Sequence, residues 1–123
     1  MRVEIPLCYG PETVNRNGWS YSKAAYEKAM NKAVKRGLYV YLPGSRYGLE
    51  GDIKNAFGQV VEYDSEKMLV DVSPEYQSLI STLLDTGSYG LIIRGTGYYR
   101  NEGKEVVDLS IYSIGLCDEL QNK

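Results

Sequence analysis

The chain contains no histidine among its 123 residues. Histidine titrates near neutral pH, is the usual proton acceptor for serine and cysteine nucleophiles, and is a common zinc ligand. Its absence excludes Ser-His and Cys-His pairs and most zinc chemistry within this chain. The two cysteines, Cys8 and Cys117, lie near opposite ends and form no metal-binding motif. We expect free, buried thiols in a reducing compartment, with a bridge between two terminal strands as the alternative.

Long apolar runs and a strong excess of one charge are also missing. No apolar run approaches the ~18–20 residues that span a bilayer, and the first residues, MRVEIPLCYG, are too polar for the apolar segment of a signal peptide. The net charge of -2 lacks the basic excess typical of nucleic-acid binding. We therefore expect a soluble, cytosolic chain with no membrane or nucleic-acid partner, and its length predicts one domain over residues 1–123.

Tyrosine is the one abundant aromatic residue, with 12 copies against one tryptophan and one phenylalanine. Tyrosine suits a pleated, half-buried surface, which predicts a β-rich fold. It is also enriched at protein–protein contacts, which predicts an assembly surface. The two interpretations are compatible, and both remain open at this point.

Two helices are predicted from capping residues and apolar spacing. Ser22 can cap a helix over Lys23–Arg36, and Gly37 can end it. Ser73-Pro74-Glu75 can open a second helix that ends near Gly87. Each helix carries one apolar stripe, formed by Tyr26, Ala29, Met30, Ala33 and Val34 in the first and by Tyr76, Leu79, Ile80, Leu83 and Leu84 in the second.

Runs of aromatic and β-branched residues predict the strands. They cover residues 3–8, 38–42, 56–63, 67–72, 89–93 and the segment after Lys104, and a DSE turn joins the third to the fourth. The resulting order is β-α-β-β-β-α-β-β. Hairpin-like succession with two helices predicts an α+β domain with a mostly antiparallel sheet. We expect that sheet to form a small barrel.

The segment SYGLIIRGTGYY, Ser88–Tyr99, raises the question of a functional loop, because we expect its strand to end in a Gly-Thr-Gly turn. A phosphate-binding loop is excluded by spacing, since Lys104 is followed by Glu105 where a Ser or Thr is required. Stacking of Tyr98 and Tyr99 on a nucleic-acid strand is disfavoured by the neighbouring acids. The loop acids Glu50 and Asp52 lack the further ligands that calcium needs, so we expect no metal and no cofactor.

Several stretches together resemble one protein family. They are NRNGWSYSKAAYEKAM, in which Asn15, Asn17, Gly18 and Tyr21 match an N-x-N-G-x-x-Y pattern; AFGQVVEYDSEKMLVDV; LLDTGSYGLIIRGTG; and EVVDLSIYSIGLCDE. In this order they are similar to the prohead (capsid maturation) serine proteases of tailed phages, which are related to herpesvirus assemblin. The resemblance covers most of the chain and implies a small barrel of that family's type.

The same resemblance implies that this chain is a shortened, inactive member. Matching Gly90, Arg94, Gly95 and Gly97 to the family's nucleophile motif places Ile92 where the serine should stand. The family's catalytic histidine belongs in the loop 43–52, where Ser45–Tyr47 are the nearest residues. Without the serine no acyl-enzyme can form, and without the histidine no side chain accepts the proton of the nucleophile. We expect Ile92 to point into or beside the core, near this loop.

The resemblance therefore predicts a non-catalytic structural protein of the virion, assembled in the host cytoplasm. It would bind capsid or other head proteins, with Tyr98 and Tyr99 as candidate contact residues, and self-association is left open. One alternative is a divergent, active serine hydrolase that uses a Ser–Lys pair. Another is a small peptide-binding regulatory module.

Overall fold

The computed structural model describes residues 1–14, 18–42, 56–99 and 105–120. Within these ranges lie two α-helices, α1 (Lys23–Arg36) and α2 (Gln77–Asp85), and one 3-10 turn, Pro74–Tyr76. Seven strands make one sheet: β1 (Arg2–Pro6), β2 (Ser20–Tyr21), β3 (Tyr39–Tyr41), β4 (Ala56–Tyr63), β5 (Lys67–Val72), β6 (Gly90–Tyr99) and β7 (Glu105–Cys117). The predicted α+β class and element order are confirmed, and β2 is an addition that the sequence did not reveal.

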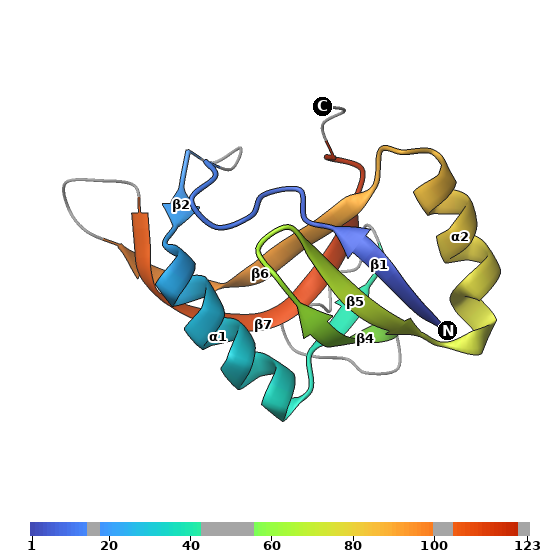
Figure 1. Ribbon diagram of the computed structural model, residues 1–123, viewed down its shortest axis with the longest axis horizontal. Coiled ribbons are helices and arrows are strands. Elements are labelled where there is room, and N and C mark those ends of the chain that lie inside the picture. The colour runs from blue at the N-terminus through green and yellow to red at the C-terminus, as the bar shows by residue number, and fades with distance from the viewer. Residues whose placement is uncertain (15–17, 43–55, 100–104, 121–123) are drawn as a thin grey trace.

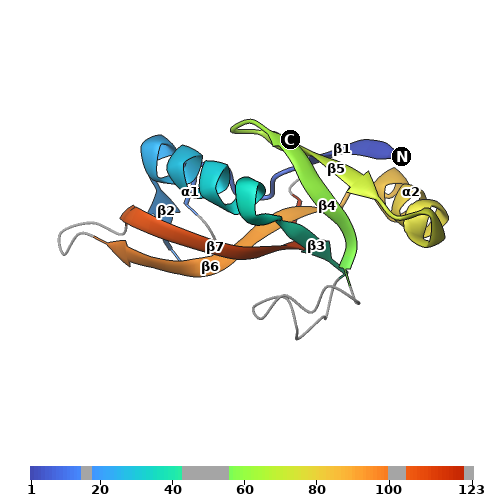
Figure 2. The same ribbon diagram turned by 90° about the horizontal axis from the view of Figure 1, so that it is seen from below.

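The sheet is mixed but mostly antiparallel. Its path runs β1-β5-β4-β3-β7, with β6 on the other side of β7. The short strands β2 and β3 run parallel to β7, and the remaining pairs are antiparallel. The β6–β7 hairpin extends along much of the long axis of the molecule, and α1 lies across it on one face (Figures 1 and 2).

The predicted barrel is wrong, because the sheet does not close. The two ends of its path, β1 and β6, meet at one isolated bridge between Leu7 and Leu91, where the Cys8 amide donates to the Leu91 carbonyl over 2.9 Å. Pro6 has no amide hydrogen, so β1 cannot extend a regular ladder through this position. A single bridge leaves the sheet open, with β6 largely unpaired on its outer side.

Helix α1 forms as its sequence predicts. The Ser22 hydroxyl accepts a hydrogen bond from the Ala25 amide, and Gly37 ends the helix with φ of 105°, a conformation that glycine adopts without strain. One face of the helix is buried, including the large side chains of Tyr26 and Met30. The Tyr26 hydroxyl crosses the core to donate to the Asp64 carbonyl at 2.8 Å, which joins α1 to the β4–β5 turn.

The second predicted helix is shorter than expected and less buried. Ser73 and Pro74 begin a 3-10 turn, and α2 starts only at Gln77. Ile80 is the one fully buried residue of the predicted apolar stripe, and Leu79, which belongs to the same stripe, is 44% exposed. Helix α2 lies at one end of the molecule (Figure 1). No helix in the described part of the chain is long and apolar enough to cross a membrane.

Two bulges in β4 adapt the sheet to its core. Phe57 and Val61 are the extra residues, because the pairing shifts next to each of them. The first bulge allows Phe57 to be fully buried although Val60 already supplies the core from the same strand. The core then continues through the inner faces of β5, β3 and β7 to α1.

Candidate functional site

The glycine-rich segment is a continuous strand. Strand β6 runs from Gly90 to Tyr99 and pairs with β7 over its whole length. The predicted Gly-Thr-Gly turn is therefore wrong: Gly95, Thr96 and Gly97 lie opposite Ile111, Ser110 and Leu109. Glycine permits a turn but does not impose one, and the long apolar partner strand decides the local structure here.

Close packing explains the three glycines of the motif. A Cβ on Gly90 would lie 2.8 Å from the Cys8 sulfur, and one on Gly95 would overlap the Ser110 carbonyl oxygen. A Cβ on Gly97 would overlap a methyl group of Val106. These positions exclude larger residues because neighbouring strands approach closely, so the glycines need no catalytic explanation.

Ile92 lies on the face of β6 opposite the core, so the expectation that it points into or beside the core is wrong. Its neighbour Leu91 is fully buried in the core, and successive side chains of a strand point to opposite faces. Ile92 is half-buried and pairs with Gly115 of β7. On the other side of β7, Tyr41 is also in register with Gly115. The strand that precedes residues 43–52 is thus two strands from Ile92, while that segment itself lies outside the described residues.

Arg94 shares this outer face. Its guanidinium lies against Gly115, because a Cβ there would come within 2.8 Å of Nε and Nη2. The arginine side chain therefore extends inward over β7. Its partner in register is Ser113, which is fully buried.

Ser113 is the residue that the sequence interpretation missed. Its hydroxyl is buried and makes no hydrogen bond within the described part of the structure. Alternation with Ile114 and Leu116, which face the core, could have placed Ser113 on the outer face beside Arg94. An arginine and a serine hydroxyl can bind an anion, but a serine nucleophile also needs a base. The chain has no histidine to serve as that base.

Several predicted site residues have no described side chain. Tyr98 and Tyr99 lie in β6 in register with Asp108 and Val106, and this backbone placement is all that the structure gives. Asn15, Asn17, Ser45–Tyr47, Glu50 and Asp52 lie outside the described ranges. Gly18 and Tyr21 of the first motif are described, and the Tyr21 hydroxyl donates to the Tyr9 carbonyl at 2.8 Å.

Cys8 and Cys117 form a second cluster, at the start of β6. Both are free and half-buried, which differs from the full burial that we expected. Cys117 pairs with Gly90, against which the Cys8 sulfur also lies, and the Cys117 thiol donates to Glu119 Oε1 at 3.3 Å. Burial, and then the neighbouring Cys117 and Glu119, raise the pKa of the Cys8 thiol to about 11. Both thiols are therefore protonated and weakly nucleophilic near neutral pH.

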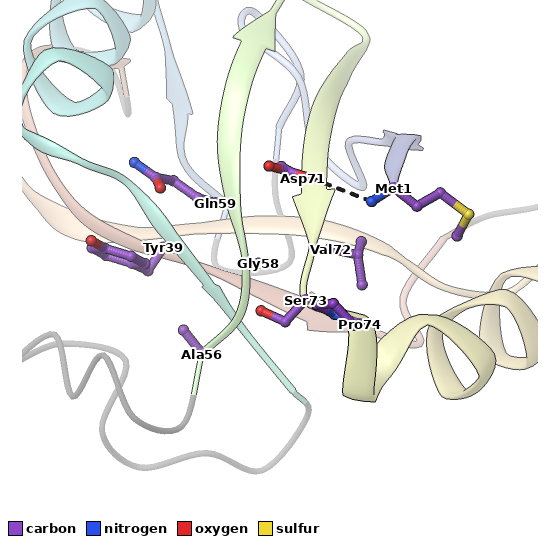
Figure 3. Close-up of a pocket in the computed structure, with 9 residues that line it drawn as sticks. All are labelled: Met1, Tyr39, Ala56, Gly58, Gln59, Asp71, Val72, Ser73 and Pro74. Carbon is purple, nitrogen blue, oxygen red and sulfur yellow. Dashed lines mark ion pairs between the residues drawn. The ribbon is translucent and has the colours of Figure 1, made fainter.

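Two open hollows lie on the described surface. One, of about 860 Å³, adjoins Cys8 and is lined by both apolar and polar residues, among them Leu7, Leu120 and Glu66. The other, of about 440 Å³, lies over β3, β4 and β5 and is shown in Figure 3. There the terminal amine of Met1 lies 3.5 Å from an oxygen of Asp71, so the two charges offset one another. Neither hollow gathers the convergent polar groups of an active site.

The described residues contain no group of three or more acidic or cysteine side chains that could hold a metal ion. The candidate site is thus the outer face of β6 and β7, formed by Ile92, Arg94, Ser113 and Gly115. Its chemistry is that of a packed surface with one cation and one hydroxyl. Comparisons with protein-family models, with curated proteins and with solved structures found no match to this chain.

Proposed function

We propose that the chain is a non-catalytic structural protein of a tailed phage, which binds capsid or other head proteins. One observation carries the proposal: isoleucine stands at position 92, where the resemblance to prohead proteases requires the nucleophilic serine, and the chain has no histidine. An isoleucine side chain has no proton to give up and no lone pair with which to attack a carbonyl carbon. The family motif is then kept for packing.

The packing of β6 supports this interpretation. Gly90, Gly95 and Gly97 are each required by a close neighbour, and Arg94 lies over Gly115. A motif whose residues all have such roles can persist after its chemistry has gone. These contacts would hold β6 and β7 as a rigid platform for a partner protein.

An active serine hydrolase is the competing function, and Ser113 is the serine nearest to Arg94 in register. Ser113 is fully buried, so a peptide carbonyl cannot reach its oxygen in this conformation. A Ser–Lys pair would need a lysine buried enough to lose its proton. Lys67 instead has a raised pKa, because Glu4 accepts a hydrogen bond from its ammonium at 3.1 Å.

Three measurements test the proposed function. Mass spectrometry of purified particles of the encoding phage should detect the intact chain. Binding of the purified protein to the major capsid protein should be saturable by calorimetry. The chain should also leave the scaffolding and capsid proteins uncleaved. Ile92→Ser should be equally inactive, because a serine at this position would still lack a histidine.

Specific cleavage that is lost in Ser113→Ala, but kept in the matched exposed variant Ser110→Ala, would support the hydrolase and contradict the proposal. Absence of the chain from particles, together with no binding to any head protein, would also contradict it. A chain that is found in particles and is inactive toward both substrates meets the expectation in full.

A further inference from the structure

The outer side of strand β6 is an unprotected sheet edge. Beyond the bridge at Leu91, no strand within the described ranges pairs with β6 on the side away from β7. Figure 2 shows β6 at the margin of the sheet, with β7 on its inner side. In an antiparallel ladder, alternate residues turn their N–H and C=O groups away from the paired neighbour. From Ile92 to Tyr99 these groups form a template for another strand.

Natural proteins usually block such an edge with short strands, prolines, charges or bulges. The opposite edge of this sheet shows these devices: β1 has five residues, includes Arg2 and Glu4, and ends at Pro6. Strand β6 has ten residues, contains no proline and has Arg94 as its only charged residue. The β1 edge of the sheet therefore has protective features that the β6 edge lacks.

Neither the charge of Arg94 nor the bulges of the β6–β7 hairpin protect the β6 edge. The guanidinium of Arg94 lies over Gly115 of β7, so the charge is held on the face of the sheet and not at its edge. The two bulges of the hairpin belong to β7, where Tyr112 and Val107 are the extra residues. Strand β6 therefore has no extra residue at either position.

We propose that this edge pairs with the same edge of a second copy of the chain, antiparallel, with the two-fold axis at Thr96. Antiparallel pairing of a strand with itself is the self-complementary arrangement that two-fold symmetry requires. This register sets Gly95 opposite Gly97 of the partner strand on each side of the axis. The residues nearest the axis are exposed and small, which allows close approach of the two backbones.

The register also separates the charges. Arg94 faces position 98 of the other copy, so the two Arg94 residues are four positions apart along the strands, or about 14 Å at ~3.4 Å per residue. This exceeds the screening length of ~8–10 Å in physiological salt. Like charges therefore do not oppose the pairing.

One pair of strands is a small interface beside the ~1,200–2,000 Å² of stable complexes, so we expect a weak dimer that depends on concentration. Sedimentation velocity of the purified full chain, up to about 1 mM, should show monomer and dimer in equilibrium. Thr96→Lys places two ammonium groups at the axis and should weaken dimerisation at least about tenfold. Ser110→Lys is the matched control, because Ser110 is also exposed and pairs with Thr96, but lies on the interior strand β7. It should leave the dimer unchanged.

Cysteine cross-linking locates the axis independently. Under mild oxidation with a small disulfide reagent, Thr96→Cys should form a disulfide-linked dimer, beyond the level that the wild-type cysteines give. The thiol of one copy attacks the reagent disulfide and releases one reagent thiol, and the free thiol of the other copy then displaces the second reagent thiol to form the bond. Ser81→Cys, exposed on α2, should not do so. Hydrogen exchange at Ile92–Gly97 should slow as concentration rises.

A wild-type chain that stays monomeric at about 1 mM overturns the proposal. Equal weakening by Thr96→Lys and Ser110→Lys, or equal cross-linking of the two cysteine variants, also overturns it, because the contact would then lie elsewhere. So does a chain that pairs this edge only with a strand of a different protein. The test uses the isolated chain, so its failure leaves the proposed head-protein binding untouched.

Discussion

The guanidinium of Arg94 lies against the backbone of Gly115, one strand away, where a Cβ would come within 2.8 Å of two of its nitrogens. Glycine at 115 thus makes room for an arginine that extends across β7. Gly115 is also in register with Ile92, the position that the family resemblance matches to a nucleophile. The contact with Arg94 also removes the only charge of β6 from the edge of the sheet.

Gly115→Ala should destabilise the fold by about 1–2 kcal/mol, because the new methyl group occupies the place of the guanidinium. The arginine is flexible and can move, which limits the loss. In an Arg94→Ala background the same change should cost less than about 0.5 kcal/mol. Urea denaturation of the four proteins of this cycle measures the coupling. Additive losses of stability would show that the alanine methyl group at position 115 and the Arg94 side chain do not affect each other.

Gly95→Ala should be more damaging than Gly115→Ala, with a loss of about 3 kcal/mol or more. Here the new methyl group meets the carbonyl oxygen of Ser110, and the backbone of β7 cannot move without breaking its pairing. Gly87→Ala is the control: φ is 75° and no atom lies nearby, so only backbone strain of ~1–2 kcal/mol applies. The reverse ranking by urea denaturation would contradict the assigned packing of β6.

Ser113→Ala should stabilise the protein by about 1 kcal/mol, since it removes a buried hydroxyl that has no hydrogen-bond partner within the described structure. Ser110→Ala, at an exposed position in the same strand, should change stability by less than about 0.5 kcal/mol. Thermal unfolding of the two variants makes the comparison. A loss of stability in Ser113→Ala would mean that the hydroxyl is bonded in solution.

Local signals predicted α1 and the β4–β5 hairpin well. Ser22 and Gly37 marked both ends of α1, and the Asp64 side chain accepts from the Glu66 and Lys67 amides in the turn predicted between β4 and β5. These features depend on residues close in sequence, so the sequence alone contains them. Burial was predicted less well, because it depends on tertiary packing. Leu79 belongs to the apolar stripe of α2 but is largely exposed.

The candidate site was predicted less well, because its geometry depends on long-range pairing. Nothing within residues 88–99 shows that Gly95 and Gly97 face a partner strand; that depends on β7, whose bulges at Val107 and Tyr112 have no sequence marker. The open sheet was missed for a similar reason. Closure depends on whether β1 and β6 form a ladder, and the chain allows one bridge between them.

Tyr26→Phe should destabilise the fold by about 1 kcal/mol, because the hydroxyl donates to the Asp64 carbonyl at 2.8 Å from a ring that is almost fully buried. Tyr63→Phe is the matched control. Its hydroxyl bonds to Asn31 Oδ1 at 3.0 Å in an exposed setting, where water replaces the lost partner. Equal losses of stability in urea denaturation would mean that burial does not increase the contribution of the Tyr26 hydrogen bond.

The pH dependence of stability should report on Cys8. Its pKa of about 11 in the folded protein is above that of the unfolded chain, so the unfolded state loses its proton first as pH rises. The unfolded state then binds fewer protons, and stability falls between pH 9.0 and about 11. Tyr21 and Tyr26 add to this fall, because burial raises the pKa of each hydroxyl.

Cys8→Ser isolates the contribution of the thiol, since serine does not ionise in this range. The free energy of unfolding of the wild type, relative to that of the variant, should fall by about 1 kcal/mol across this pH window. This value is reduced for the partial exposure of the sulfur. Urea midpoints at several pH values provide the measurement. Native-state alkylation should also be slow at neutral pH and accelerate up to pH 11 or so. A difference that is constant with pH would show that Cys8 ionises equally in both states.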